Sequence, residues 1–386
     1  MPDSPLFFLI AGEPSGDVLG ARLMRALKTK TEGRARFAGI GGERMVAEGL
    51  DLLFPQAELA HMGLVEIVRH IPHILGRLRQ TVAAVRRARP AALITIDSPD
   101  FCFRVAKKIK GEGIPLLHYV APSVWAWRAG RAKKVARFLD HLLALLPFEP
   151  PYFTRENLPC TFVGHPLVES DAGKGDPKRF RARYALPDKV PILAVLPGSR
   201  RGEIARLLPV FAATIEKLRA LHPDLHVVVP TVRSVADSVK QAVRAWPMTV
   251  IVTESDEDKY DAFAAATAAL ACSGTISVEL AMARLPTIVT YKVGKLTAEI
   301  YRRVRKTPYV TLVNIMQNRE IMPEYLQENC TAEKLAGAVH GLLSDPAARR
   351  TQCEALEAIG AWLGRGQFVP SEKAAEVVLA VVAQRL

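Results

Sequence analysis

Short apolar runs alternate with helical patterns along the whole chain. This order predicts parallel sheets covered by crossover helices, and the two halves read as two doubly wound α/β domains. The predicted strands are Leu6–Ala11, Arg36–Ile40, Ala92–Ile96, Leu116–Val120, His141–Leu145 and Thr161–Val163 in the first half, and Ile192–Leu196, Leu225–Val229, Thr249–Val252, Ala268–Cys272 and Thr287–Tyr291 in the second.

A polar stretch rich in Gly, Asp and Lys at 169–177 is the best candidate for a linker between the halves. We therefore predict an N-terminal domain at 1–168 and a second domain at 169–345. The remaining residues, 346–386, have a helical pattern. We expect them to pack back on the N-terminal domain or on a dimer partner.

The composition is typical of a globular protein: 386 residues, of which 49% are hydrophobic. Five scattered cysteines without a CxxC pair suit a reducing compartment and do not favour disulfides or a metal site. The N-terminus lacks a basic region, and no apolar run reaches ~18 residues, so we expect neither a signal peptide nor a spanning helix.

Two strand-to-helix turns in the second half are suited to binding an anion. Ser273-Gly274-Thr275 follows one predicted strand, and Pro197-Gly198-Ser199-Arg200 follows another. Such turns offer backbone N–H groups at a helix N-terminus, and an arginine adds a planar fork for phosphate oxygens. Glu279, one helical turn after Thr275, can accept hydrogen bonds from a ribose diol. An ordinary strand–helix corner with a solvent-facing glutamate remains the alternative.

Together the two turns suggest a nucleotide diphosphate at the carboxyl ends of parallel strands. The chain has no GxxxxGK[ST] loop and no GxGxxG in a strand–helix context, which disfavours ATPase and dehydrogenase functions. The first half has its own loop directly after the first strand. This loop binds an acceptor or the departing phosphates, or it is a plain βα turn. Its candidate residues are Gly12, Glu13, Ser15, Gly16 and Asp17.

Most of the net charge of +13 lies in one stretch, 69–137, which has 15 Lys and Arg against three acidic residues. The helical pattern at 64–87, in which Pro72 starts or kinks the helix, places apolar residues opposite arginines. This pattern fits a bilayer surface or an anionic, apolar substrate, with a core-packed helix as the alternative. Nucleic acid is disfavoured because the stretch has no recognised binding module. The membrane candidates are Ile71, Ile74, Leu75 and Leu78.

Seven motifs in order resemble the lipid-A-disaccharide synthase family from about residue 6 to 340. They are AGEPSGD (11–17), IDSPDF (96–101), HYVAPSVWAWR (118–128), FVGHPL (162–167), LPGSR (196–200), CSGTISVELA (272–281) and LVNIM…MPEYLQ (312–327). The resemblance implies a GT-B fold, with two Rossmann-like doubly wound parallel-sheet domains facing a cleft. It also implies an inverting hexosyltransferase that joins UDP-2,3-diacylglucosamine to 2,3-diacylglucosamine 1-phosphate. The products are the β-1,6-linked lipid A disaccharide 1-phosphate and UDP.

Family members are cytoplasmic enzymes of Gram-negative lipopolysaccharide synthesis, peripheral on the inner membrane. The resemblance therefore implies an anionic membrane surface as a partner, and a homodimer formed with the C-terminal part. In the family, the region after the last clear strand lines the cleft. Its amide side chains suit sugar hydroxyls and pyrophosphate oxygens, and the candidates are Asn314, Gln317 and Gln327.

Inversion requires a general base for the acceptor hydroxyl and positive charge for the leaving UDP. We predict Asp97, at the carboxyl end of a strand, as the base, with Asp100 as the second candidate. Either aspartate could instead cap a helix. Arg200 and the backbone amides of the two turns would stabilise the leaving group without a metal or other cofactor. His118, Trp127 and Arg128 are the remaining candidates on the acceptor side, each with a structural alternative.

Three rival functions are compatible with parts of this pattern. A UDP-sugar epimerase shares the donor site but needs no basic amphipathic face. The lipid-linked transferase of peptidoglycan synthesis carries a more Gly-rich first loop. A nucleotide-sugar sensor without catalysis would not need Asp97 together with Arg200.

Overall fold

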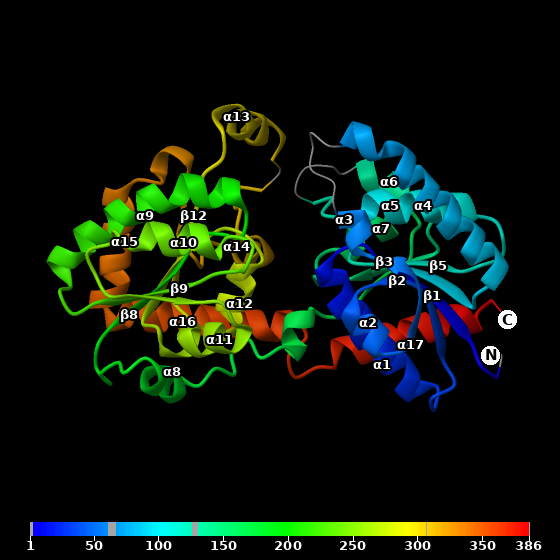
Figure 1. Ribbon diagram of the computed structural model, residues 1–386, viewed down its shortest axis with the longest axis horizontal. Coiled ribbons are helices and arrows are strands. Elements are labelled where there is room, and N and C mark those ends of the chain that lie inside the picture. The colour runs from blue at the N-terminus through cyan, green and yellow to red at the C-terminus, as the bar shows by residue number, and fades with distance from the viewer. Residues whose placement is uncertain (1–2, 61–66, 126–129, 306, 386) are drawn as a thin grey trace. The chain divides into compact units, whose positions relative to one another are not determined.

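Two fully parallel sheets organise the chain (Figure 1). The structure is a computed structural model that describes residues 3–60, 67–125, 130–305 and 307–385. The chain divides into a first domain, Met1–Pro166 with Leu363–Leu386, and a second domain, Leu167–Trp362. Within the described residues, none of the helices is both long enough and apolar enough to span a bilayer.

The first domain contains a seven-stranded sheet in the order β3-β2-β1-β4-β5-β6-β7. Its strands are β1 (Leu6–Ala11), β2 (Arg36–Gly41), β3 (Leu50–Pro55), β4 (Ala92–Ile96), β5 (Leu116–Tyr119), β6 (His141–Ala144) and β7 (Cys160–Phe162). Its helices are α1 (Pro14–Lys30), α2 (Glu43–Ala47), α3 (Ala57–Ala60), α4 (Ile67–Ala88), α5 (Pro99–Ile109), α6 (Gly130–Val135), α7 (Pro150–Thr154) and α17 (Pro370–Ala383).

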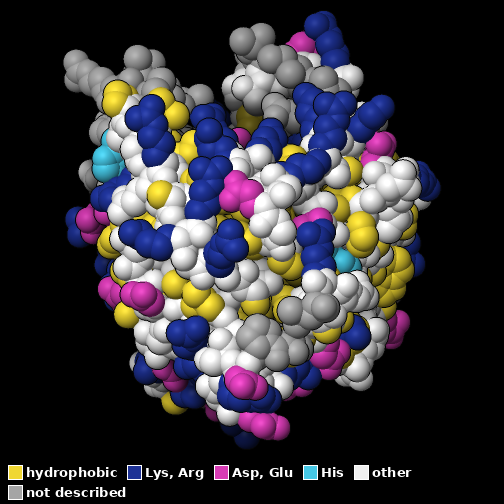
Figure 2. Space-filling model, turned by 90° about the vertical axis from the view of Figure 1, so that its right-hand side faces the viewer, with side chains coloured by type: hydrophobic (Ala, Val, Ile, Leu, Met, Phe, Trp, Pro, Cys, Tyr) yellow, Lys and Arg dark blue, Asp and Glu magenta, His cyan; other side chains and the backbone are white. Residues whose placement is uncertain are grey.

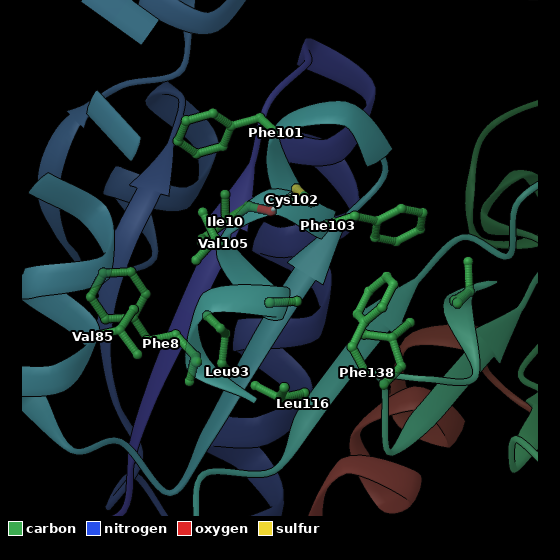
Figure 3. Close-up of a cluster of buried hydrophobic side chains, with 14 of the residues drawn as sticks. Phe8, Ile10, Val85, Leu93, Phe101, Cys102, Phe103, Val105, Leu116 and Phe138 are labelled. Carbon is green, nitrogen blue, oxygen red and sulfur yellow. Dashed lines mark hydrogen bonds between the residues drawn. The ribbon is translucent and has the colours of Figure 1, made fainter. Parts of the chain in front are cut away.

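Both faces of this sheet are buried, since its central strands β1 and β4 are apolar at every position except Thr95. Phe8 and Ile10 of β1 pack with side chains of α4 and α5 in one cluster (Figure 3). The alternate residues, Phe7 and Leu9, pack on the other face with α1 and α17. Two-sided burial explains why these strands appear in the sequence as continuous apolar runs.

The second domain repeats the plan with six strands in the order β10-β9-β8-β11-β12-β13. The strands are β8 (Ile192–Leu196), β9 (His226–Pro230), β10 (Val250–Thr253), β11 (Ala268–Cys272), β12 (Thr287–Tyr291) and β13 (Glu324–Leu326). The helices are α8 (Pro177–Arg183), α9 (Arg201–Leu221), α10 (Ala236–Val243), α11 (Asp256–Ala265), α12 (Ile276–Met282), α13 (Lys295–Val304), α14 (Leu312–Gln317), α15 (Ala332–Ser344) and α16 (Pro346–Trp362).

All predicted strands form, within about one residue at each end, but β3 and β13 were not predicted. Both are edge strands. In β3 several positions are exposed, and β13 has only three half-buried residues. An edge strand that buries so little does not need a continuous apolar run, so its sequence carries a weak signal.

The C-terminal segment predicted at 346–386 is divided between the domains. Helix α16 belongs to the second domain, where it packs on α12, and α17 belongs to the first domain, where it packs on α1. An ion pair from Lys30 to Glu376, 2.9 Å between Nζ and Oε1, joins α1 to α17. The first domain is therefore built from both ends of the chain.

Candidate functional site

The strand order reverses at one place in each sheet: between β1 and β4 in the first domain, and between β8 and β11 in the second. Loops that leave such neighbouring strands run to opposite faces of the sheet and leave a crevice, where α/β proteins bind ligands. Four of the seven sequence motifs occupy the loops after these four strands. The fold therefore gives each domain one candidate site.

In the second domain, residues after β8 and β11 line a pocket of about 470 Å³. It brings together seven of the residues predicted to bind a donor nucleotide, at positions about 75 residues apart in the chain. They are Gly198, Ser199, Arg200, Ser273, Gly274, Thr275 and Glu279.

The turn after β8 is shaped by Glu203, which the sequence reasoning missed. Its Oε2 accepts hydrogen bonds from the backbone N–H groups of Ser199 and Arg200, both at 3.3 Å. Gly198 has φ +110°, and a Cβ there would lie 2.7 Å from the same carboxylate oxygen, so this position requires glycine. The signal was present as a glutamate three residues after the N-cap residue Arg200.

Arg200 itself extends from the rim of the pocket. Its side chain is 80% exposed, and Nη1 lies 3.2 Å from Oε1 of Glu203. An exposed pair of this kind is weak, so a phosphate can compete for the guanidinium at little cost.

A second residue missed from the sequence, Lys259 of α11, also lines this pocket. Its Nζ lies 2.9 Å from Oε2 of Glu279, and both side chains are largely buried. Burial opposes the charge of Lys259, but Glu279 and Asp256 outweigh burial and raise the pKa of the ammonium group. Lys259 therefore stays protonated and holds the Glu279 carboxylate in place. No motif in the sequence marks a lysine in the middle of this helix.

Three other residues predicted for donor binding lie outside the lining of this pocket. Asn314 is fully buried, and its amide group bonds to the backbone of Ile321 and Met322 and to Glu324. Gln327 accepts a hydrogen bond from the backbone N–H of Val293 at 3.4 Å. Gln317 ends α14. Asn314 thus has a structural role, holding the turn between α14 and β13.

In the first domain, the loop after β1 lies against the residues that follow β4. A Cβ on Gly12 would lie 2.4 Å from the Ser98 hydroxyl, and one on Gly16 would lie 3.4 Å from the Ile96 carbonyl. Glu13 and Ser15 are exposed, whereas Asp17 is buried. Asp17 accepts hydrogen bonds from the backbone N–H groups of Gly42, Arg44 and Met45, at 2.8 to 3.1 Å, so it fastens the start of α2.

Asp97 lies directly after β4 and lines a pocket of about 240 Å³ together with His118 and Arg131. Its backbone has φ +50°, a left-handed conformation that is uncommon outside glycine and is often found at functional sites. The backbone N–H of Asp97 donates to the Tyr119 carbonyl at 2.9 Å, and the Ser15 hydroxyl lies 3.5 Å from Oδ2. The carboxylate is therefore fixed by its backbone and remains open to the pocket.

His118 is buried beside this carboxylate and is uncharged. Burial lowers its pKa to about 3, and the positive charge of Arg131 contributes to the shift. Nδ1 lies 2.8 Å from the Thr95 hydroxyl, and the ring packs on Phe103 with centroids 4.6 Å apart. Asp100, the second candidate for the base, is exposed and lines a neighbouring pocket. Trp127 and Arg128 lie outside the described residues.

A buried carboxylate anchors the segment that follows His118. Glu149 is 3% exposed; its Oε1 accepts a hydrogen bond from the Trp125 indole at 3.2 Å, and its Oε2 accepts one from the Leu146 backbone at 3.0 Å. Burial raises the pKa of Glu149 from 4.5 to about 7. Between pH 4.5 and pH 7, the Glu149 carboxyl group therefore binds a proton more tightly in the folded state than in the unfolded state. As a result, the contribution of this group to the free energy of unfolding decreases as the pH rises over this range.

Glu149→Gln removes this titration. We expect the difference in melting temperature, variant minus wild type, to increase from pH 5 to pH 8. Each kcal/mol by which the wild type loses stability over this range corresponds to about 2–4 °C. Calorimetry at both pH values measures the difference. The same change at Glu43, an exposed position in the same domain, is the control for the substitution itself. A flat difference for Glu149→Gln would contradict the raised pKa.

Comparisons with known proteins cover almost the whole chain. The family model of lipid-A-disaccharide synthetase matches residues 7–378. The chain is 55% identical over 383 residues to lipid-A-disaccharide synthase of Rhodospirillum centenum, covering 99% of this chain and 96% of the relative. It is 50% identical over 383 residues to the enzyme of the same name from Paramagnetospirillum magneticum, covering 98% of each.

Solved structures share the fold at low sequence identity. A UDP-GlcNAc 2-epimerase from Neisseria meningitidis, bound to UDP-GlcNAc, aligns with TM-score 0.66 and 10% identity over 98% of this chain and 100% of that one. The calicheamicin glycosyltransferase CalG4 aligns with TM-score 0.63 and 15% identity over 100% and 99%. The predicted GT-B class, with two Rossmann-like parallel sheets, is confirmed. Together with the family match, this shows that the chain belongs to the lipid-A-disaccharide synthase family and is a glycosyltransferase of lipid A biosynthesis.

Proposed function

We propose that this enzyme transfers 2,3-diacylglucosamine from UDP to the 6-hydroxyl of 2,3-diacylglucosamine 1-phosphate, with inversion at the anomeric carbon. The observation that carries the proposal is the second-domain pocket, where two anion-binding turns meet a buried carboxylate held by Lys259. Backbone amides of the turn after β11, together with Arg200, suit a pyrophosphate, and Glu279 suits a ribose diol. This is the chemistry of a nucleoside diphosphate.

In this mechanism Asp97 takes the proton from the acceptor hydroxyl as that oxygen attacks the anomeric carbon. The bond from that carbon to the UDP oxygen breaks in the same displacement, and Arg200 with the turn amides stabilises the charge that develops on UDP. His118, being neutral, can orient the acceptor or the Asp97 carboxylate without competing for its charge. No step requires a metal ion, and we propose that the reaction is independent of Mg²⁺.

The test is incubation with both diacylated precursors, followed by chromatography and mass spectrometry. A β-1,6-linked disaccharide 1-phosphate and one equivalent of UDP are the expected products. Release of a free 2-epimer would instead indicate an epimerase, and transfer only to a polyprenyl-linked acceptor would indicate the peptidoglycan enzyme. Binding of the donor without any product would leave a nucleotide-sugar sensor.

Both substrates carry acyl chains, so we also propose peripheral binding to the cytoplasmic face of the inner membrane of a Gram-negative cell, as a homodimer. Lys and Arg side chains gather over the upper part of the first-domain face in Figure 2, with few acidic residues among them. Such a surface attracts anionic headgroups, and each basic residue near it is worth ~1 kcal/mol.

Helix α4 carries the residues predicted to enter the membrane, but not all of them are available. Leu75 is 38% exposed, Ile74 is partly buried against the core, and the side chain of Ile71 lies outside the described residues. Leu78 is only 4% exposed and packs in the core cluster, so its assignment to the membrane is corrected. The 3.6-residue period places Leu78 on the face that turns toward the sheet.

Leu75→Ser should therefore weaken binding to vesicles that contain anionic lipid, because it removes an apolar side chain that the fold leaves exposed. Co-sedimentation measures the bound fraction, and circular dichroism verifies the fold. The control is Val46→Ser at another exposed position of the same domain, 43% exposed, which should bind like the wild type. If the folded Leu75→Ser protein sediments normally, Leu75 has no membrane role.

A further inference from the structure

Helices α5 and α6 enclose a second pocket in the first domain, of about 610 Å³. Arg104 and Lys107 from α5 line it, together with Arg131 and Lys134 from α6. The sequence predicted a basic stretch here, but not that these four side chains meet around one cavity. Asp100 is the one carboxylate among the lining residues.

The cations of this pocket lack paired carboxylates among the described residues. None of the four forms an ion pair with a carboxylate in the part of the chain that the structure describes. Basic side chains elsewhere on the domain do find such partners: Arg77 pairs with Glu58, and Arg86 pairs with Glu112. Four positive charges around one hollow exceed the single carboxylate of Asp100 in its lining, and this excess favours an anionic ligand with a charge of more than one.

Aromatic rings at the floor of the pocket hold two of these cations. The Arg131 guanidinium lies 5.7 Å from the ring centroid of Phe103, and the Lys107 ammonium lies 5.2 Å from that of Phe138. The two rings meet edge to face at 5.4 Å and belong to the core (Figure 3). Because the rings are buried, the cations above them lose less freedom when they bind a ligand than side chains in open solvent would.

This pocket adjoins the one that contains Asp97. Pro99 and Arg131 line both. We infer that the α5–α6 pocket binds the 1-phosphate of the acceptor sugar, while Asp97 in the adjoining pocket faces its 6-hydroxyl. A phosphomonoester carries close to two negative charges at neutral pH and several acceptor oxygens, which matches a cluster of arginine and lysine donors. The inference rests on the proposed function for the identity of the sugar.

The headgroup of an anionic lipid such as phosphatidylglycerol offers related phosphate chemistry, but as a diester with a single charge. A hollow with four converging cations favours the monoester, whereas lipid headgroups need only an open basic surface. The basic face in Figure 2 is available for that purpose. The experiment must therefore separate an acceptor subsite from a lipid-binding surface.

The variant to test is Lys107→Gln combined with Lys134→Gln, which removes two charges from the pocket and leaves Arg131, Asp97 and the core rings in place. The matched control is Lys108→Gln combined with Lys133→Gln. These lysines lie on the same two helices and are exposed, and they do not line the pocket. Both double variants lower the net charge by the same amount, so any difference between them comes from position.

Glucosamine 1-phosphate, which has no acyl chains, is the direct probe. We expect calorimetry to show roughly tenfold or greater loss of its affinity for the pocket variant, as is typical when charge-assisted hydrogen bonds are removed, and no change for the control. Glucosamine without the phosphate should bind the wild type and the pocket variant equally. Equal weakening in the control, or no detectable glucosamine 1-phosphate binding by the wild type, overturns the inference.

Turnover gives the second readout. The pocket variant should lose kcat/KM roughly tenfold or more with 2,3-diacylglucosamine 1-phosphate as the acceptor, while the KM for the UDP-linked donor stays unchanged. If the protein binds glucosamine 1-phosphate but makes no disaccharide, the proposed reaction fails and the anion pocket stands. If the pocket variant detaches from phosphatidylglycerol vesicles more than the control while its acceptor kinetics are unchanged, the pocket is a lipid-binding surface and the inference is wrong.

Discussion

Asp97→Asn should reduce the turnover rate by about 10²–10⁴-fold, the usual contribution of a general base. The amide is close in size to the carboxylate but cannot take a proton from the acceptor hydroxyl. Asparagine also tolerates the left-handed backbone found at this position, with φ +50°, so the variant should fold. Single-turnover assays measure the chemical step, and calorimetry should show UDP binding close to that of the wild type because the donor pocket lies in the other domain.

Asp100→Asn is the matched control, since Asp100 is three residues away, exposed, and lines the neighbouring pocket. It should retain most of the activity. If Asp97→Asn kept more than about a tenth of the wild-type rate while Asp100→Asn lost activity, Asp100 and not Asp97 would be the general base.

Arg200→Ala should weaken UDP binding and slow the chemical step by roughly 10–100-fold, because a hydrogen bond to a charged group is worth ~1.5–3 kcal/mol. The guanidinium is mostly exposed and makes only a weak pair with Glu203, so its removal should leave the fold intact. UDP affinity by calorimetry and kcat with saturating donor separate the two effects.

Arg201→Ala tests whether an arginine at any position near the start of α9 would bind UDP and stabilise the leaving group as Arg200 is proposed to do. Arg201 is exposed in the first turn of α9 but does not line the pocket, so this variant should behave like the wild type. Activity of the wild type should also survive EDTA, since Arg200 and the turn amides would carry the charge of the leaving UDP. Strict dependence on added Mg²⁺ would refute the metal-free proposal.

The sequence predicted the site best where residues follow directly after central strands. Gly198 and Thr275 follow strands of the second-domain sheet, and Asp97 follows a strand of the first-domain sheet. Parallel strands bring their carboxyl ends to one edge of each sheet. A correct strand prediction therefore fixed their neighbourhood. Asn314 and Leu78 lie on helices instead, where a polar or apolar side chain meets the core or solvent according to the packing of other elements.

What the sequence determined by itself is the architecture and the loops that carry the chemistry. Continuous apolar runs of strand length favour central strands buried on both faces, and small-residue turns after them place backbone amides at helix starts. Only the tertiary structure decided which helical side chains join these loops. Lys259 meets Glu279, and Lys107 meets Arg131, across elements that are not adjacent in the chain. The hydrophobic period of a helix encodes which face is buried but not what its charged residues contact.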